Sequence, residues 1–389
     1  MTAYDAPTLS NSDISELTEW RRMLHRNPEL SGEERETALQ VQAMLAPTLP
    51  DEVIAGLGGH GVAAVYQGAE PGPTVMVRCE LDALPIEELG EVAHRSTVPG
   101  KGHLCGHDGH MAIMAATARW LGRNRPTRGR AIVLFQPAEE DGSGAAKVLE
   151  DARFAALAPD YALSVHNFPG LALGHAVLAA GPMNCASRGM KITLTGRTAH
   201  ASQPENGVSP APALATLIPT LTALSHGTRS ADPHFALATV THARLGEPAF
   251  GIAPGFAEVW VTLRTQKDDA MADLVARAEA EVHKAAGEGG VKAGISYHDV
   301  FHHCENHPEA TQILMDALQS QSIPVSSGNL PMRASEDFGR FGACAKSAMF
   351  LLGSGTDSPS LHNPDYDFPD TLIPLGARIF VSALRTKLY

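Results

Sequence analysis

The chain has 389 residues, of which 44% are hydrophobic and 19% charged, and these values exclude a disordered protein and favour two globular domains. Its formal net charge of −13 argues against a nucleic-acid partner, because binding a phosphate backbone needs clustered lysine and arginine. No uninterrupted apolar run reaches the roughly 18 residues of a membrane-spanning helix, so we expect no membrane association.

Helical and strand patterns alternate in the first half of the chain. Apolar residues at helical spacing predict helices over 14–24 and 33–45, with polar residues 11–13 as caps of the first. Apolar runs bounded by turn residues predict strands over 62–66, 74–78, 131–135 and 161–165, with a helix over 109–121. This alternation predicts an α/β domain whose sheet is covered by helices on both faces.

The region 185–298 has a different pattern. It predicts a strand, a helix, two strands, a helix and a strand, over 190–195, 212–226, 235–241, 257–265, 268–287 and 291–297. That order is typical of a ferredoxin-like α+β domain. Alternating elements return at 310–319, 348–352 and 372–388. We therefore predict a discontinuous catalytic domain, 1–184 and 299–389, with a mixed central sheet flanked by helices, and an inserted domain over 185–298.

The cysteines and the N-terminal sequence predict a cytoplasmic protein. The five cysteines are odd in number and scattered, which is typical of a reducing compartment and not of a disulfide framework. The first 13 residues have neither the basic nor the apolar segment of a secretory signal peptide.

Thiol and imidazole groups gather just before the predicted helix over 109–121. The segment 102–110 has the sequence GHLCGHDGH, which places Cys105 and His107 on a glycine-rich loop. Thiolate and imidazole are good ligands for zinc and similar divalent metals, and glycines let a backbone fold tightly around an ion. The alternatives are a flexible loop with a buried thiol, and a cysteine nucleophile activated by His107 or His110. Only a cysteine nucleophile would remain active after metal removal.

Two adjacent carboxylates, Glu139 and Glu140, follow the predicted strand over 131–135. Open α/β sheets place their sites at the carboxyl ends of strands. Hydrolysis at a metal needs one carboxylate to hold the ion and another to take a proton from water. Adjacent glutamates can divide these roles, although an isolated pair is more typical of a solvent-exposed helix start.

Other acidic and histidine residues follow further predicted strands. Glu80 and Asp82 follow the strand over 74–78, His166 and Asn167 follow the one over 161–165, and His362 lies in a polar loop. A lone histidine at such a place is usually a packing residue, but several such residues at the ends of successive strands indicate a site.

Two residues of the inserted region are candidates for substrate contact. His200 lies in a polar loop, where an imidazole could stabilise an oxyanion. Arg264 could bind a substrate carboxylate through its planar guanidinium. Each could equally be an ordinary surface group.

Six stretches of the chain resemble the aminoacylase and glutamate-carboxypeptidase superfamily of dinuclear metallopeptidases. They are LHRNPEL (24–30), RCELDALP (78–85), CGHDGH (105–110), QPAEE (136–140), SEDF (335–338) and LHNP (361–364). The pair CGHDGH and QPAEE, in that order, is specific to the amidohydrolase branch that contains hippurate hydrolase and the plant auxin–amino-acid conjugate hydrolases.

This resemblance implies roles for the candidate residues. Two divalent metals would be held by Cys105, which bridges them, His107, Glu140, His166 and His362. Glu139 would be the general base, Asp82 would support the site from behind, and His200 would help to stabilise the tetrahedral intermediate, in some members from a partner subunit. The resemblance also implies a homodimer formed through the inserted domain.

The predicted function is hydrolysis of the amide bond of a small N-acyl amino acid or short peptide, with Arg264 and Asn167 as candidate substrate contacts. Zinc or manganese is the expected metal, and cobalt or nickel is possible because this ligand set accepts each with little geometric penalty. The alternatives are a metallo-carboxypeptidase or dipeptidase, and a non-catalytic protein that has kept the fold. Two segments differ from the resembled family. Relatives often have Asn-Val-Ile-Pro where this chain has Gly-Ile-Ala-Pro (251–254), and Gly-Gly-His-Ala in the loop where this chain has Arg-Thr-Ala-His-Ala (197–201). Both segments lie where the end groups of a substrate would be bound, so the sequence does not predict those groups.

Overall fold

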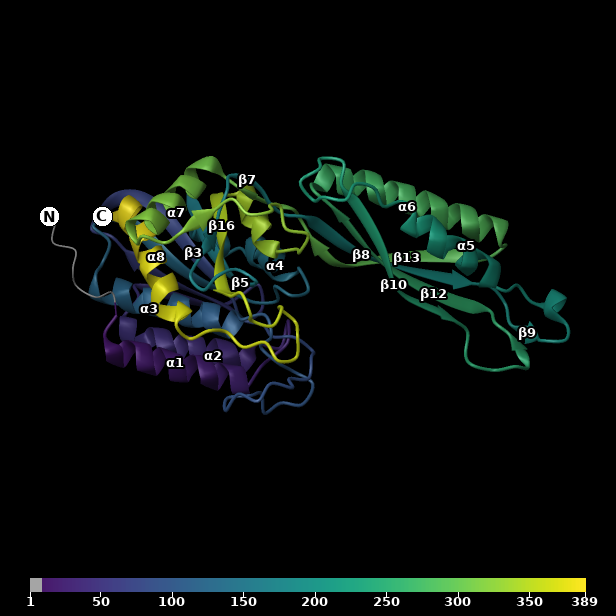
Figure 1. The fold of residues 1–389 in the computed structure, drawn as a ribbon, viewed down its shortest axis with the longest axis horizontal. Coiled ribbons are helices and arrows are strands. Elements are labelled where there is room, and N and C mark those ends of the chain that lie inside the picture. Colours follow the sequence, from purple (N-terminus) through teal and green to yellow (C-terminus); the bar gives the residue numbers. More distant parts are fainter. Residues whose placement is uncertain (1–8) are drawn as a thin grey trace. The chain divides into compact units, whose positions relative to one another are not determined.

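The computed structural model describes residues 9–389, which form two compact units (Figure 1). The larger unit comprises the chain up to Met183, Glu305–Gly328 and Asp337–Tyr389, and the smaller unit comprises Asn184–Cys304 and Asn329–Glu336. The predicted range 185–298 lies within the smaller unit. The prediction that no signal peptide is present concerned the first 13 residues, and residues 1–8 of these lie outside the described residues. Between residues 9 and 389, no helix is both long and apolar enough to cross a membrane.

The larger unit is built on a mixed eight-stranded sheet. In spatial order its strands are β1 (Glu52–Leu57), β2 (Gly61–Gln67), β4 (Arg128–Gln136), β3 (Glu70–Glu80), β5 (Tyr161–Pro169), β16 (Lys346–Gly355), β6 (Ala176–Val177) and β15 (Val325–Ser326). The central strands β4, β3, β5 and β16 run parallel, whereas β1, β2 and β6 introduce antiparallel pairs. This mixed sheet confirms the predicted fold class, although β1 was not predicted.

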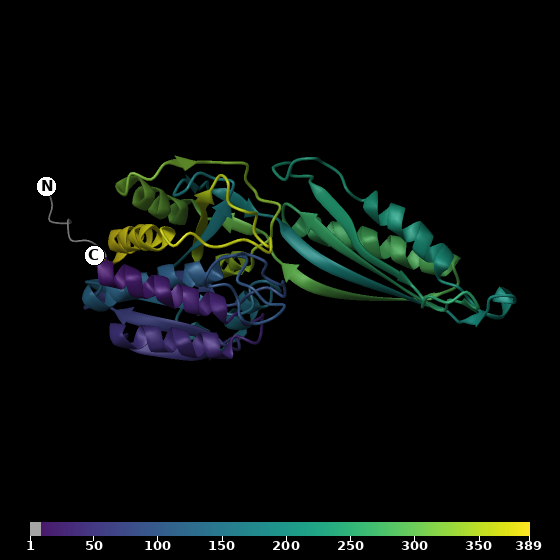
Figure 2. The ribbon, with the colours of Figure 1, turned by 60° about the horizontal axis from the view of Figure 1, so that its bottom comes forward.

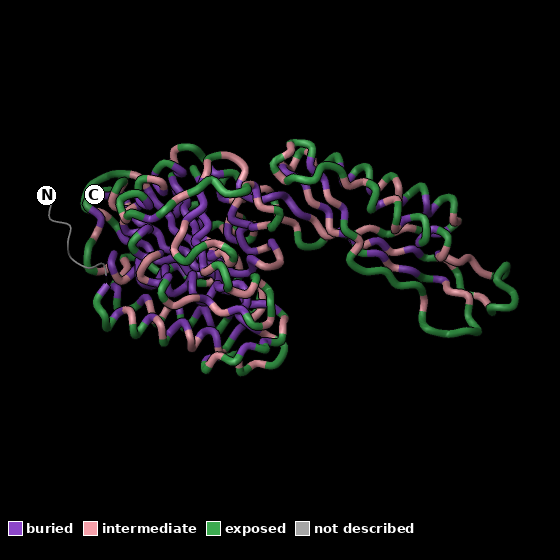
Figure 3. Tube along the Cα trace, viewed as in Figure 1, coloured by how far each residue is buried: buried purple, intermediate pink, exposed green. Residues whose placement is uncertain are grey.

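Helices cover one face of this sheet. They are α1 (Asn11–Arg26), α2 (Arg35–Leu45), α3 (His107–Arg123), α7 (Pro308–Ser320) and α8 (Leu372–Leu388). Along β3, Val75, Val77 and Cys79 join the core beneath these helices. Because successive side chains of a strand point to opposite faces of the sheet, Arg78 points to the other face. There it meets Asp337 in the short 3-10 helix η4 (Asp337–Ala343), which packs beside α4 (Gly144–Glu150). Figure 3 shows buried positions filling the centre of this unit.

The start of α1 corrects one detail of the sequence-based assignment. Residues 11–13 lie inside the helix, and Ser10 is the cap: its hydroxyl accepts from Asp13 N–H while the Asp13 carboxylate accepts from Ser10 N–H. This reciprocal pair is a capping box, which satisfies two backbone donors at once.

The smaller unit contains the six predicted elements in the predicted order. They are β8 (Ala186–Thr195), α5 (Ala211–Thr222), β10 (Ala236–Leu245), β12 (Phe256–Thr265), α6 (Asp268–Glu288) and β13 (Lys292–Phe301). The four strands form an antiparallel sheet in the order β10-β12-β8-β13. Both helices lie on one side of it (Figure 1, Figure 2), where alternate residues such as Met190, Ile192 and Leu194 form the core. This is the predicted α+β arrangement.

Candidate metal centre

The candidate site lies where three neighbouring parallel strands end. Asp82 follows β3, Glu139 and Glu140 follow β4, and His166 lies in the last part of β5. Because β4, β3 and β5 are adjacent and parallel, their carboxyl ends meet at one edge of the sheet. The loop before α3 adds Cys105 to this edge, and α3 itself begins at His107.

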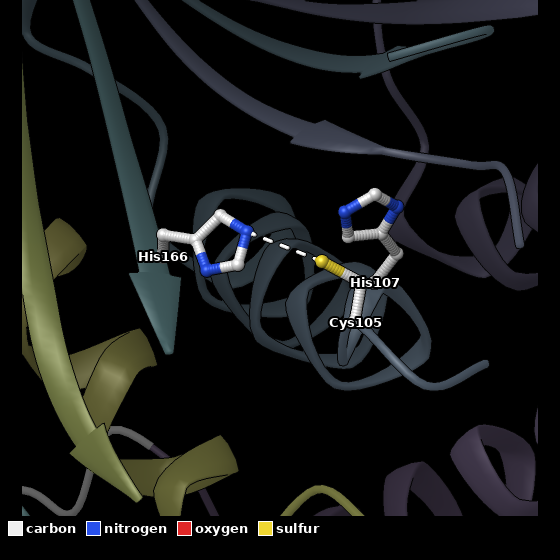
Figure 4. A group of neighbouring side chains, drawn as sticks. All are labelled: Cys105, His107 and His166. Carbon is white, nitrogen blue, oxygen red and sulfur yellow. Dashed lines mark hydrogen bonds between the residues drawn. The ribbon is translucent and has the colours of Figure 1, made fainter. Parts of the chain in front are cut away.

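Gly106 allows the loop to approach β5 closely. Its φ of +89° is left-handed, and a Cβ at this position would lie 2.5 Å from Asn167 Oδ1. The approach brings Cys105 Sγ to 3.6 Å from His166 Nε2, as Figure 4 shows. The glycine therefore lets the chain place a thiol against an imidazole.

The five residues predicted to be metal ligands gather here and share neighbours. Cys105, His107 and His166 form one group whose possible ligand atoms all lie within 4.8 Å of one another, and Cys105, Glu140 and His362 form another. Glu140 lies between two imidazoles, with Oε1 3.8 Å from His107 Nε2 and Oε2 3.6 Å from His362 Nε2. These distances leave room for a cation between the facing atoms.

The hydrogen bonds of the two buried histidines test whether these residues fit a metal. His107 Nδ1 lies 2.8 Å from the Asp82 carbonyl oxygen, and His166 Nδ1 lies 2.8 Å from that of Asn167. A carbonyl can only accept, so Nδ1 carries a proton in both rings, which leaves Nε2 as the nitrogen that can bind a metal. His107 Nε2 is buried and has no hydrogen-bond partner among the described residues. This arrangement is typical of metal-binding histidines, and the donor set fits divalent metals.

The electrostatics of the cluster argue against a cysteine nucleophile. Burial raises the pKa of Cys105 well above its ordinary value, and the charges of Glu140 and Glu139 raise it further. Such a thiol is a poor nucleophile by itself, because the thiolate is the reactive form. Burial also lowers the pKa of His166 to about 3, so this imidazole is neutral, as a ligand requires.

Asp82 touches both the histidine and the glutamate sides of the cluster. Its backbone oxygen accepts from His107, and its Oδ2 accepts from Glu140 N–H at 2.9 Å and from Ser31 Oγ at 2.7 Å. Burial raises the pKa of Asp82, but the hydrogen bond and charge of His107 outweigh burial and leave that pKa below its usual value. Burial lowers the pKa of His107, but the hydrogen bond with Asp82 and the charges of Glu80 and Glu140 outweigh burial and raise it to about 10, so a metal ion would displace a proton from this ring. Asp82 thus holds the His107 ring and the backbone of Glu140.

A buried ionic network that was not predicted lies beneath the site. Arg78 is fully buried and donates to Glu80, to Asp337 at 2.7 Å and to Gln136 at 2.9 Å. Glu80 Oε2 lies 2.6 Å from His110 Nδ1, and His110 Nε2 accepts from Asn167 N–H at 3.1 Å. The network joins four of the motif stretches, 78–85, 105–110, 136–140 and 335–338, and the presence of its residues in these stretches was the only sequence signal for it.

A second buried charge cluster contacts the other side of α3. Arg21 donates to Asp108 at 3.0 Å and to Asp367 at 2.7 Å, and His25 bonds Asp108 at 2.8 Å. His25, His94 and Asp367 also have metal-compatible spacing. The Arg21 guanidinium already lies 2.7 Å from His94 Nε2, so a cationic side chain fills that place.

The remaining predicted residues are placed as follows. Asn167 is buried, and its side-chain amide donates to Tyr366. In the smaller unit, Arg264 donates to Arg333 O and Ser335 Oγ, both at 2.7 Å, and burial lowers its pKa. His200 is exposed in the short strand β9 (Ala199–His200), with Nδ1 2.7 Å from Ser202 Oγ. Neither Asn167 nor Arg264 is thus a freely extended substrate contact.

The sheet edge and its thiol, imidazole and carboxylate cluster define a metal-dependent hydrolase. Residues 76–386 match the model of peptidase family M20/M25/M40, and the chain belongs to this family. It is therefore a metal-dependent hydrolase of amide bonds. This finding confirms the resemblance seen in the motifs.

Individual relatives cover nearly the whole chain. The N-acetyl-L-cysteine deacetylase of Bacillus subtilis is 30% identical over 91% of this chain and 83% of its own length. The thermostable carboxypeptidase 2 of Saccharolobus solfataricus is 30% identical over 94% and 95%. The YXEP protein of Bacillus subtilis, described as a dinuclear metal-binding peptidase, has a solved structure that matches with a TM-score of 0.80 and 24% identity over 96% and 98%, which supports the fold.

Proposed function

We propose that this protein hydrolyses the amide bond of N-acyl amino acids with two divalent metal ions. The observation that carries the proposal is the cluster in which Glu140 lies between His107 and His362 while Cys105 faces His166. In the proposed site Cys105, His107, Glu140, His166 and His362 would hold the two ions. The similar deacetylase acts, by its name, on an N-acyl amino acid.

Glu139 is the proposed general base. When bound, two divalent ions polarise an amide carbonyl and lower the pKa of a water molecule towards neutrality. The Glu139 carboxylate would take the proton of that water and pass it to the leaving nitrogen. The placement of the neighbouring glutamate supports this division, because Glu140 approaches the imidazoles of both His107 and His362, whereas the Glu139 carboxylate lies 4.0 Å from His107.

The smaller unit is the proposed dimerisation domain. Its exposed apolar side chains are candidates for such a contact, and they are Leu245, Phe250, Ile252, Phe256 and Trp260. His200 lies in β9, which pairs with β11 (Ile252–Ala253) in the same part of this unit. His200 would stabilise the developing oxyanion of a bound substrate. The substrate carboxylate would be bound by backbone amides, or by Arg264 in exchange for its hydrogen bonds to Arg333 O and Ser335 Oγ.

A carboxypeptidase or dipeptidase activity is the second candidate, favoured by the similarity to a thermostable carboxypeptidase. Both activities cleave an amide next to a carboxylate-bearing residue, so they differ in the acyl group that the protein accepts. Zinc or manganese is the proposed metal, with cobalt or nickel as the alternatives, and the cytoplasm is the proposed location.

A substrate panel tests the proposal. The protein is stripped with chelator, reloaded with each metal and assayed on N-acetyl, N-benzoyl and longer N-acyl amino acids and on dipeptides. We expect the highest kcat/KM on an N-acyl amino acid, no activity after chelation, and recovery on reloading. Higher kcat/KM on dipeptides would support the second candidate. Activity that survives chelation but is lost in Cys105→Ser, and not in the control Cys344→Ser at an exposed thiol, would instead indicate a cysteine hydrolase.

A further inference from the structure

Glu34 is a buried acid to which neither the sequence motifs nor the proposed chemistry gives a role. It stands directly before α2 and is completely buried. Its Oε1 accepts a hydrogen bond from Ala138 N–H at 2.7 Å, and its Oε2 has no hydrogen-bond partner of normal geometry among the described residues. Burial raises the pKa of Glu34, and backbone N–H groups offset this only in part. A carboxyl group is seldom buried at such cost without a specific partner.

Its partner, Ala138, has an unusual backbone conformation. The φ of Ala138 is +49°, in the left-handed region, which strains a residue that has a Cβ. Such a conformation persists only where the surroundings impose it. Here Glu34 holds the N–H side, and Gly144 N–H donates to Ala138 O at 2.9 Å. Gly144 packs so closely that a Cβ there would lie 1.7 Å from Pro137 O.

The strained residue directly precedes the two glutamates of the site. Glu140 N–H is held by Asp82, which in turn accepts from Ser31, three residues before Glu34. The loop at 31–34 therefore holds the turn on both sides of Glu139, directly through Glu34 and indirectly through Ser31. A turn fixed in this way sets the direction in which each glutamate side chain leaves the backbone.

We propose that Glu34 is a positioning residue for amide hydrolysis: it keeps Ala138 in the left-handed conformation and so aims the Glu139 carboxylate. The inference rests on the proposed function, in which Glu139 is the general base. A Glu34 that only filled space would tolerate any residue of its size. A positioning Glu34 needs a hydrogen-bond acceptor at the distance of Oε1.

Two variants of nearly equal size separate these roles. Glu34→Gln keeps an oxygen acceptor, and Glu34→Met removes it. We expect the metal-loaded Met variant to lose ~10- to 100-fold in kcat with KM within about threefold, since a small misplacement of a catalytic group costs up to ~100-fold in rate. The Gln variant should stay within about threefold of the wild-type kcat, because it can still accept from Ala138. Glu33→Gln is the matched control, since Glu33 is an exposed neighbour in the same loop.

Two measurements besides activity complete the test. Equilibrium metal binding to the stripped protein should be similar in both variants. Amide hydrogen exchange over 137–144 should be faster in the Met variant only. If the Met variant does not fold, Glu34→Asp replaces it, because a carboxylate shortened by one methylene keeps the charge but does not reach Ala138.

The outcomes distinguish this inference from the proposed function. Wild-type kcat in Glu34→Met or Glu34→Asp, or equal losses in the Gln and Met variants, would overturn the positioning role. If Glu139→Gln is inactive in the same series, the role of Glu139 as general base would stand even though the positioning role of Glu34 had been overturned. A fully active Glu139→Gln would overturn the role of Glu139 itself, whatever the Glu34 variants show.

Discussion

Replacing Glu139 by glutamine removes a proton acceptor from the site while keeping the size of the side chain. Glu139 is 5% exposed, and its Oε2 lies 4.0 Å from His107 Nε2. Loss of a general base typically lowers the rate by about 10² to 10⁴, which corresponds to roughly 2.7 to 5.4 kcal/mol of transition-state stabilisation. We expect the loss in kcat, with KM little changed, because the proton transfer takes place only on the way to the transition state.

The same replacement at Glu140 should give a different result. Its carboxylate oxygens lie 3.8 Å from His107 Nε2 and 3.6 Å from His362 Nε2. The neutral amide of Glu140→Gln would be a weaker ligand, whereas the backbone would stay in place because Asp82 holds the Glu140 N–H. We expect weaker metal binding and activity that recovers in part when metal is added in excess.

The assay is steady-state hydrolysis of the best N-acyl amino acid as a function of added metal, with elemental analysis of each variant. Glu150→Gln, an exposed position on α4, is the control for a general effect of removing one negative charge. Metal loss in the 139 variant together with an inactive but metal-replete 140 variant would show that the two roles are reversed. Near-normal activity of both variants would refute a carboxylate-based mechanism at this site.

Three further predictions concern the metal and the buried charges. Removal of metal should lower the melting temperature as well as abolish activity, because ions that bind only the folded state stabilise it; a calorimetric scan with and without chelator checks this. Despite burial, the charge of Asp108 raises the pKa of His25 to about 9. Because folding raises this pKa, protonated His25 stabilises the folded state fully below the unfolded pKa of about 6.5, and this stabilisation is lost as pH rises through 9. The free energy of unfolding should therefore fall by up to ~3 kcal/mol over this pH range. The fall should be smaller in His25→Gln. Asp337→Asn leaves Arg78 buried with one fewer negative partner and should lower the free energy of unfolding by ~3 kcal/mol or more. Urea unfolding measures this change, with the exposed Asp357→Asn as the control. A decrease below ~1 kcal/mol would contradict this expectation.

Sequence alone indicated most of the candidate site, because its residues have chemically distinctive side chains at the ends of recognisable strands. Cys105 and His107 lie within three positions, and Glu139 lies four positions after the apolar run 131–135. The sequence also indicated the six elements of the smaller unit, since their apolar periodicity is regular. Edge strand β1 was missed because its exposed positions leave little periodic pattern to detect.

The buried supports of the site could not be predicted, because they join residues that are far apart in the chain. Arg78 meets Asp337 across 259 positions, and Arg21 meets Asp367 across 346. An arginine in a strand pattern gives no sign that a carboxylate will meet it inside the fold. The segment Asn329–Glu336 was likewise assigned to the catalytic domain, but it belongs to the smaller unit, where Cys185 N–H donates to Met332 O.

The two glutamates show most clearly where sequence reasoning ends. Glu139 and Glu140 have identical side chains, so their chemistry depends on where the backbone points each one. That direction depends on Ala138, which is left-handed although nothing in its side chain favours that conformation. Its N–H is held by a carboxylate 104 positions away, and the N–H of Glu140 by another 58 positions away. Under the proposed mechanism, the division of roles within this adjacent pair would therefore depend on Glu34 and Asp82, which are distant from it in sequence.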